Sequence, residues 1–201
     1  MTALAGRNMN SEDISRVLAF IKKAEGLKNT LRHSFTSNGR QESAAEHSWR
    51  LCLFVMACAP WFRNLDCEKL LRLAVIHDLA EALCGDTPAI CRENKEIKAA
   101  RERAALSEIC STLPEELQKE MLSAWEEYES ASTEEAKLVK GLDKLETLIQ
   151  HNQGRNPINF DYKFNLAYGK ELTDKNDTLT LFRKNIDEET KEKINNQTSG
   201  C

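Results

Sequence analysis

The chain has 201 residues, of which 41% are hydrophobic and 30% are charged, and its formal net charge at pH 7 is −4. This length suits one compact domain, and the composition is that of a folded protein rather than a disordered one. The negative charge argues against a general nucleic-acid-binding surface, which needs a basic face. A small anionic substrate remains possible, because a metal ion and one or two arginines can dominate the local field.

Seven cysteines show no closely paired pattern, and several lie in apolar stretches as small core residues. The first ten residues contain no apolar segment typical of a secretory signal. No apolar run approaches the roughly 20 residues that a membrane span needs. We therefore expect a protein of the reducing cytoplasm, with neither a membrane nor a nucleic acid as partner.

Helical periodicity extends over almost the whole chain. Residues 14–21 place apolar side chains three and four positions apart and predict a first helix, with Ser11 as its N-cap. A polar loop over 36–42 precedes the segment 43–46, whose sequence SAAE is a capping-box pattern. The second helix is expected to begin there and to end near Pro60.

The remaining helices are expected near 66–83, 93–111, 114–130, 133–150, 160–169 and 176–194. The helix over 133–150 is expected to start at Thr133 and to bury an apolar stripe made of Leu138, Val139, Leu142, Leu145, Leu148 and Ile149. A turn over 85–88 follows the first of these, and the residues after 195 are expected to form a frayed tail. No segment has the alternating pattern of a strand, and no repeat or linker stands out. The predicted fold class is all-α, a single-domain helical bundle.

His77 and Asp78 are adjacent inside an apolar helical run, where burying them without a partner would be costly. A divalent cation held by two imidazoles and two carboxylates would satisfy them, and His47 and Asp143 are the candidates for the other ligands. Glu81 lies four residues after His77. One continuous helix would therefore present two ligands and a further carboxylate to the same point.

Two imidazoles and two carboxylates leave open positions on an octahedral ion. This favours one Mn²⁺, Co²⁺, Mg²⁺, Fe²⁺ or Ni²⁺ over a structural Zn²⁺, which thiolates more often hold. Such an ion would polarise a phosphoryl oxygen, and Glu81 would transfer a proton. Only His33 and His151 remain as further histidines, and His151 lies beyond the expected end of the Asp143 helix, so one metal is favoured over two.

Each of these residues also has an ordinary structural interpretation. A single histidine on an apolar helix is more often a satisfied core residue. Asp143 can face solvent, and Glu81 and Asp86 can be carboxylates at a helix end. This interpretation is weaker for the four residues together, because four polar side chains would then have to lie in one buried core for unrelated reasons.

Three segments together resemble the HD-domain phosphohydrolases: 45–48 (AEHS), 77–88 (HDLAEALCGDTP) and 138–144 (LVKGLDK). The resemblance covers about residues 27–148. It is greatest to the branch that contains the bacterial 5'-deoxynucleotidases and related eukaryotic HD-domain-containing proteins. The residues that it implies as ligands of one divalent metal ion are His47, His77, Asp78 and Asp143.

The same resemblance implies roles for neighbouring residues. Glu81 would assist proton transfer, and Asp86 would support the site. Arg32 matches an arginine that contacts the nucleotide, and its planar guanidinium suits phosphate oxygens, although a solvated surface arginine is the alternative. His33 stands where the deoxynucleotidases of the family have a tryptophan that helps to discriminate the sugar, so a preference for deoxyribose stays open.

Two more charged residues are candidates for substrate binding. The segment 125–129 resembles a family segment that supplies a carboxylate near the sugar hydroxyl, with Glu127 as the match and a charged helix face as the alternative. Arg40 could reach the anion from its loop. The resemblance also implies a homodimer. The sequence itself only hints at one through the aromatic residues near the C-terminal end, which could form an interface but which core packing explains equally well: Phe160, Tyr162, Phe164 and Tyr168.

We therefore expect one HD domain over residues 1–201, with a metal-site core over about 27–150 and C-terminal helices over about 160–194. The expected activity is that of a metal-dependent phosphomonoesterase acting on (deoxy)nucleoside 5'-monophosphates. One alternative is a hydrolase of another nucleotide phosphate, such as a triphosphate or an alarmone, although the chain has no Gly-rich phosphate loop. The other is a non-catalytic metal-binding scaffold.

Overall fold

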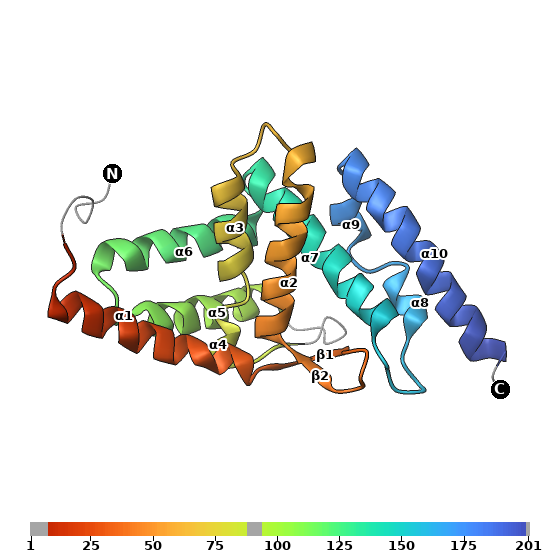
Figure 1. Cartoon of the computed structure of the whole chain (residues 1–201), viewed down its shortest axis with the longest axis horizontal. Helices are drawn as coiled ribbons and strands as arrows, with labels where there is room; N and C mark the ends of the chain where they lie inside the picture. Colours follow the sequence, from red (N-terminus) through yellow and green to blue (C-terminus); the bar gives the residue numbers. More distant parts are fainter. Residues whose placement is uncertain (1–7, 88–93, 200–201) are drawn as a thin grey trace.

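The computed structural model of the chain describes residues 8–87 and 94–199. Helices form the framework, which confirms the predicted class (Figure 1). The α-helices are α1 (Ser11–Ala24), α2 (Ala44–Cys58), α3 (Cys67–Ile76), α4 (Glu81–Cys84), α5 (Lys95–Cys110), α6 (Glu115–Ser130), α7 (Glu134–Gln153), α8 (Tyr162–Asn165), α9 (Lys170–Thr173) and α10 (Asp177–Ser199). Two 3-10 helices, η1 (Glu25–Lys28) and η2 (Ala59–Trp61), and two strands, β1 (Leu31–Phe35) and β2 (Gln41–Ser43), complete the described elements.

α7 is the central helix, because α2, α3, α6, α9 and α10 all contact it (Figure 1). Thr133 caps its start by accepting a hydrogen bond from the backbone N–H of Ala136, as the sequence predicted. The expected apolar stripe is buried except for Ile149, which is half-buried, and Leu142 and Leu148 are fully enclosed. Burying each such leucine stabilises the fold by about 1.5–3 kcal/mol. Asp143 therefore projects from a firmly held helix.

α2 begins as the sequence predicted. The hydroxyl of Ser43 accepts a hydrogen bond from the backbone N–H of Glu46, and the carboxylate of Glu46 accepts one from the backbone N–H of Ser43. His47 lies in the first turn and is completely buried. The helix ends at Cys58, and Pro60 lies in the 3-10 turn that follows.

The hairpin of β1 and β2 is a departure from the prediction of an entirely helical chain. Its strands are antiparallel, with Leu31 opposite Ser43 and Phe35 opposite Gln41. Gly39 in the connecting turn has a φ of 89°, which suits glycine. Strands this short show too few alternating positions to be recognised against the surrounding helical pattern.

The hairpin is fixed to the C-terminal end of α7. The side-chain amide of Gln150 donates to the carbonyl of Phe35 at 2.6 Å, and the backbone N–H of Arg155 donates to the carbonyl of Thr36 at 3.0 Å. These bonds place β1, which carries Arg32, beside the helix that carries Asp143.

The prediction of one continuous helix over 66–83 is wrong, because α3 ends at Ile76 and α4 begins only at Glu81. Nδ1 of His77 donates to the carbonyl of Ala74 at 2.8 Å, within the last turn of α3. The backbone N–H of Glu81 then donates to the carbonyl of Asp78 at 2.9 Å, a bond that spans three residues instead of four. The expected i, i+4 helical face therefore does not exist, and the connecting turn sets the direction of these side chains.

Other helix ends differ from the predictions by a few residues. Asn10, not Ser11, is the N-cap of α1, because the side chain of Asp13 completes a capping box with it. α7 continues far enough to include His151, and α10 continues to Ser199 where a frayed tail was expected.

The segment 160–169 contains the short helix α8 instead of one longer helix, and the chain turns at Gly169, whose φ is 69°. The turn predicted over 85–88 ends at Pro88, which lies outside the described residues. Among the helices of the described segments, none combines the length and the apolar character that a membrane crossing requires.

Candidate metal centre and cavity

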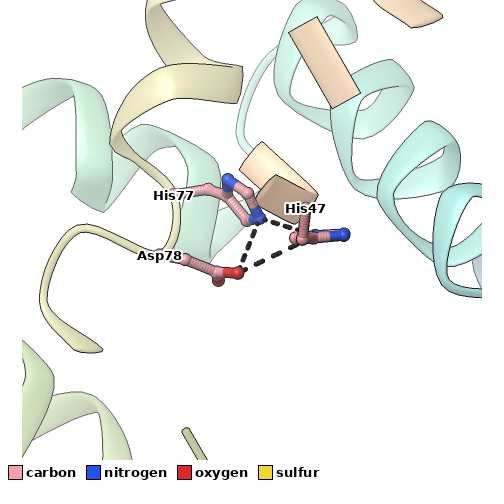
Figure 2. A group of neighbouring side chains, drawn as sticks. All are labelled: His47, His77 and Asp78. Carbon is pink, nitrogen blue, oxygen red and sulfur yellow. Dashed lines mark hydrogen bonds and ion pairs between the residues drawn. The ribbon is translucent and has the colours of Figure 1, made fainter. Parts of the chain in front are cut away.

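The polar atoms of the four predicted ligands meet at one place, although they come from α2, the α3–α4 turn and α7. Nε2 of His47 lies 3.2 Å from Nε2 of His77 and 3.1 Å from Oδ1 of Asp143. Oδ2 of Asp78 lies 3.1 Å from Nε2 of His77 and 3.8 Å from Nε2 of His47 (Figure 2). His47, His77 and Asp78 each offer one ligand atom, and these atoms all lie within 4.8 Å of one another.

The hydrogen bonds of the two imidazoles indicate what this cluster binds. Nδ1 of His77 donates to the carbonyl of Ala74, and Nδ1 of His47 donates to the carboxylate of Glu146. In these neutral tautomers both Nε2 atoms carry lone pairs, which face each other and two carboxylate oxygens. That arrangement is repulsive unless a cation lies between the four groups.

The separations fit a metal ion as that cation. Nitrogen and oxygen ligands bind such ions at about 2.0–2.2 Å, so two ligands at right angles lie about 3 Å apart. The two imidazole nitrogens of this cluster are 3.2 Å apart. Each imidazole also donates its other N–H to an oxygen, which is the usual support of a metal-bound histidine. The donor set and its spacing therefore fit one divalent ion.

The electrostatics of the cluster also favour a cation. Burial raises the pKa of Asp78, but His77, His47 and Arg32 together hold that pKa well below its usual range. Burial and Arg32 lower the pKa of His47, but the carboxylates of Glu146 and Asp143 outweigh them and raise it to about 9. The cluster thus attracts a proton in the absence of a metal ion.

Residues behind the ligands hold them in place, and the sequence pattern did not predict this role for them. Glu146 is almost fully buried and accepts hydrogen bonds from Nδ1 of His47 and from Nε of Arg50. The hydroxyl of Tyr128 and the ammonium of Lys144 each donate to Oδ2 of Asp143 at 2.9 Å. One sequence signal could have revealed these supporting residues. Glu146 is a charged residue within the leucine stripe of α7, where burial requires a polar partner.

Glu81 is buried beside the ligand cluster. Burial raises the pKa of its carboxyl group to about 10, and the charges of Asp78 and Asp86 contribute to the rise. Its Oε2 has no hydrogen-bond partner among the described residues. In the absence of a metal ion Glu81 therefore carries a proton at neutral pH, which is the state that a general acid needs.

Arg32 is positioned by three polar groups. Its guanidinium donates to Oδ2 of Asp78 at 3.3 Å and to the hydroxyl of Thr147 at 3.1 Å, and its Nε lies 3.4 Å from Oε2 of the buried Glu42. Only 12% of the side chain is exposed, so Arg32 is not a solvated surface arginine. A guanidinium fixed in this way is prepared to bind an anion.

A cavity of about 670 Å³ opens beside the cluster, which is a usual size for a small-molecule site. Asp78, Glu81, Asp86 and Asp143 line its polar end. The rest of the cavity lining includes Arg32, His33, Phe35, Lys144, Thr147, His151, Phe160, Phe164 and Tyr168. His33 is exposed at the rim, on the same strand as Arg32.

The structure does not bring Glu127 or Arg40 to this cavity. The carboxylate of Glu127 pairs with Nζ of Lys69 at 2.8 Å and accepts a hydrogen bond from the hydroxyl of Thr133, and the residue lines a different hollow. Arg40 is exposed and pairs with Glu46. Both residues therefore have local partners that account for them.

With this geometry in place, comparisons with known proteins give a consistent result. A family model described as HD domain matches residues 24–181. The chain is 37% identical to 5'-deoxynucleotidase HDDC2 of Mus musculus over 139 residues, which is 68% of this chain and 69% of that protein. It is 32% identical to 5'-deoxynucleotidase HDDC2 of Homo sapiens over 155 residues, which is 76% of this chain and 75% of that protein.

Solved structures are similar in fold. A protein described as a predicted metal-dependent phosphohydrolase from Magnetospirillum magnetotacticum MS-1 aligns with a TM-score of 0.77 at 24% identity, over 90% of this chain and 94% of that one. A conserved hypothetical protein from Pyrococcus furiosus aligns with a TM-score of 0.57 at 30% identity, over 87% and 99%. The helical architecture around the cluster is therefore shared with these proteins.

Proposed function

Because the chain belongs to the HD domain family, we propose that it is a metal-dependent phosphohydrolase, specifically a 5'-nucleotidase of (deoxy)nucleoside 5'-monophosphates. The observation that carries the proposal is the convergence of His47, His77, Asp78 and Asp143 at the polar end of a cavity. The similarity to curated 5'-deoxynucleotidases supports the substrate class.

The metal ion and the residues of the cavity would each have a separate role in the reaction. The metal ion, when bound, would supply Lewis-acid polarisation of the phosphoryl group. Arg32, held by its three partners, would bind the remaining phosphate oxygens. A water molecule would attack the phosphorus atom, the bond to the 5'-oxygen would break, and Glu81 would donate its proton to that leaving oxygen, which releases the nucleoside and inorganic phosphate. Asp86, which lines the same cavity, contributes to the raised pKa of Glu81.

The choice of metal is also part of the proposal. Two imidazoles and two carboxylates favour Mn²⁺, Co²⁺, Mg²⁺, Fe²⁺ or Ni²⁺ over a structural Zn²⁺. The thiols of Cys52, Cys58, Cys67, Cys84 and Cys110 are free and none belongs to the ligand cluster.

A matrix of metals and nucleotides tests the function, with release of inorganic phosphate as the readout. We expect release from deoxynucleoside 5'-monophosphates with at least one of these metals, and no comparable release from the triphosphates. Faster release from triphosphates or from guanosine alarmones would favour the alternative that the protein hydrolyses another nucleotide phosphate. A protein that binds Mn²⁺ or Co²⁺ and hydrolyses none of these compounds would favour the scaffold.

Two properties implied by the family resemblance complete the proposal. One is a homodimer, which sedimentation velocity would distinguish from a monomer. The aromatic residues considered for a dimer interface are accounted for within one chain. Tyr162 is buried, and Phe160, Phe164 and Tyr168 line the cavity. The other is a cytoplasmic location, which the free thiols support and which localisation of the tagged protein would test.

A further inference from the structure

The cavity has a second end that the proposed chemistry leaves without a role. Three half-buried aromatic side chains from residues 160–168 line it, and Phe35 of the hairpin lines it as well. We call the three side chains Phe160, Phe164 and Tyr168 the aromatic wall. Exposed aromatic rings in a cavity are costly in water, so an apolar partner for them is expected.

The aromatic wall begins beside the metal cluster. Nζ of Lys144 lies 2.9 Å from Oδ2 of Asp143 and 5.4 Å from the ring centroid of Tyr168. The rings of Tyr168 and Phe164 follow each other with centroids 5.4 Å apart and planes tilted by 31°. Tyr168 therefore lies beside the reacting end of the cavity. The ring of Phe160 instead contacts His151, which lies about 12 Å along α7 from Asp143.

The segment that carries the wall is fixed from behind. The buried guanidinium of Arg183 donates to the carbonyl of Tyr168 at 2.6 Å and to that of Asn165 at 2.8 Å. The side-chain oxygen of Asn165 lies 3.0 Å from Nδ1 of His151, whose ring meets that of Phe160 edge to face. The backbone that carries the wall is thus held in place before any ligand arrives, which reduces the entropy lost on binding.

We propose that the aromatic wall is a nucleobase subsite, on which the base stacks against Phe164 and Phe160 while the phosphate lies at Arg32. The proposal rests on the function proposed above and extends it to the other end of the substrate. Stacking uses the face of a base and every base has one, so the subsite accepts purines and pyrimidines alike. The sugar would then lie between the two ends, near Tyr168 and His33.

Kinetics of Phe164→Ala test the subsite. We expect the KM for dAMP and dTMP to rise about tenfold, which lies within the range known for loss of one aromatic–base stack. The kcat/KM for 2-deoxyribose 5-phosphate, which lacks a base, is expected to stay unchanged. Phe164→Trp, which keeps a stacking surface, should have a KM close to that of the parent. Phe62→Ala is the matched control, because Phe62 is also half-buried but lines a separate cavity.

Equal losses toward nucleotides and 2-deoxyribose 5-phosphate, or an unchanged KM for nucleotides, would overturn the subsite. A parent protein that releases phosphate from no nucleotide would instead contradict the proposed function. In that case calorimetric titration with thymidine and deoxyadenosine still tests the wall, because these nucleosides carry no phosphate. Binding to the parent that is weakened in Phe164→Ala supports the subsite, and no binding to either protein refutes it.

Discussion

At the scale of single residues, Glu146 determines how His47 can act. Its carboxylate accepts the Nδ1 proton of His47 and is itself held by Arg50. This keeps the lone pair of Nε2 directed at the other ligands, and a carboxylate in this position also makes an imidazole a stronger ligand. The chemistry of the metal centre therefore depends on a residue that is not a ligand.

Glu146→Gln is expected to weaken the binding of Mn²⁺ or Co²⁺ about 10–100-fold, because the amide orients His47 less strongly. Isothermal titration of the metal-free protein measures this change. Glu134→Gln, at an exposed position of the same helix, is the matched control and should bind the metal as the parent does. Unchanged affinity in Glu146→Gln would show that the fold alone orients the histidine.

Glu81→Gln separates metal binding from turnover. The amide has a similar size but carries no acidic proton, so we expect kcat to fall about 10²–10⁴-fold, as is usual when a general acid is lost. Metal affinity is expected to stay near that of the parent, whereas His77→Ala should abolish it. Turnover of Glu81→Gln at the parental rate would remove Glu81 from the mechanism.

His151 links stability to pH. Burial lowers the pKa of its imidazole to about 4 in the folded protein, whereas an unfolded chain has a pKa near 6.5. As pH falls from about 6.5 to 4, the unfolded chain takes up the proton first, so the free energy of unfolding decreases over this window. We expect the titration of His151 to lower the free energy of unfolding by at most about 3 kcal/mol over this window.

Denaturant unfolding of the parent and of His151→Gln at pH 7.5 and pH 4.5 measures that contribution. The parent should lose more stability between the two pH values than the variant, because the other titrating groups are common to both. Equal losses would mean that His151 is solvated enough to keep its ordinary pKa.

At the scale of elements, the contact between the end of α7 and the hairpin positions the substrate-binding side chain. A Cβ atom at Gly154 would lie 2.2 Å from the backbone carbonyl oxygen of Phe35. Only glycine fits this approach, and Gln150 reaches the same carbonyl. Arg32 is on the strand that ends at Phe35, so its position depends on a contact at the far end of that strand.

Gly154→Ala is expected to lower the free energy of unfolding by about 1–3 kcal/mol, because the backbone of the hairpin has to move away. The KM for nucleotides should rise as well, since Arg32 moves with the strand. Chemical denaturation and phosphate-release kinetics measure the two effects. A variant with parental stability and KM would show that the hairpin adapts without displacing Arg32.

The α3–α4 turn also positions side chains of the site. His77 ends one helix and Glu81 begins the next, and Asp78 lies in the turn between them. The apolar pattern of the sequence continues through this turn, and for that reason the pattern predicts one helix over 66–83. The side-chain bond of His77 to the carbonyl of Ala74 and the short-range backbone bonds after it close the first helix early.

At the scale of the whole molecule, α7 connects the two ends of the cavity. It contributes Asp143 to the cluster and Glu146 to the support of His47, fixes the hairpin through Gln150, and holds His151 against the aromatic wall. Because α2 and α3 pack on the same helix, the ligands from these segments meet only when the fold is complete. Metal binding is therefore expected to be coupled to folding.

This coupling is measurable as thermal stability. Saturating Mn²⁺, at about 100 times its Kd, would stabilise the folded protein by about 2.7 kcal/mol. For a protein of this size that corresponds to a rise in Tm of roughly 5–10 °C, which a chelator should reverse. His77→Ala should show no rise. An equal rise in parent and variant would assign the effect to another site.

The sequence by itself determined the helical class, the caps at Ser43 and Thr133 and the buried stripe of α7, because these follow from local periodicity and from neighbours a few residues apart. It also singled out the His and Asp residues that the structure brings together, since such residues are costly in apolar helices. Only the tertiary structure decided the break after Ile76, the hairpin and the support of His47 by Glu146. It also decided that Phe160, Phe164 and Tyr168 line the cavity, whereas Tyr162 is buried. These features depend on contacts between residues far apart in the chain, and local sequence patterns carry no record of those contacts.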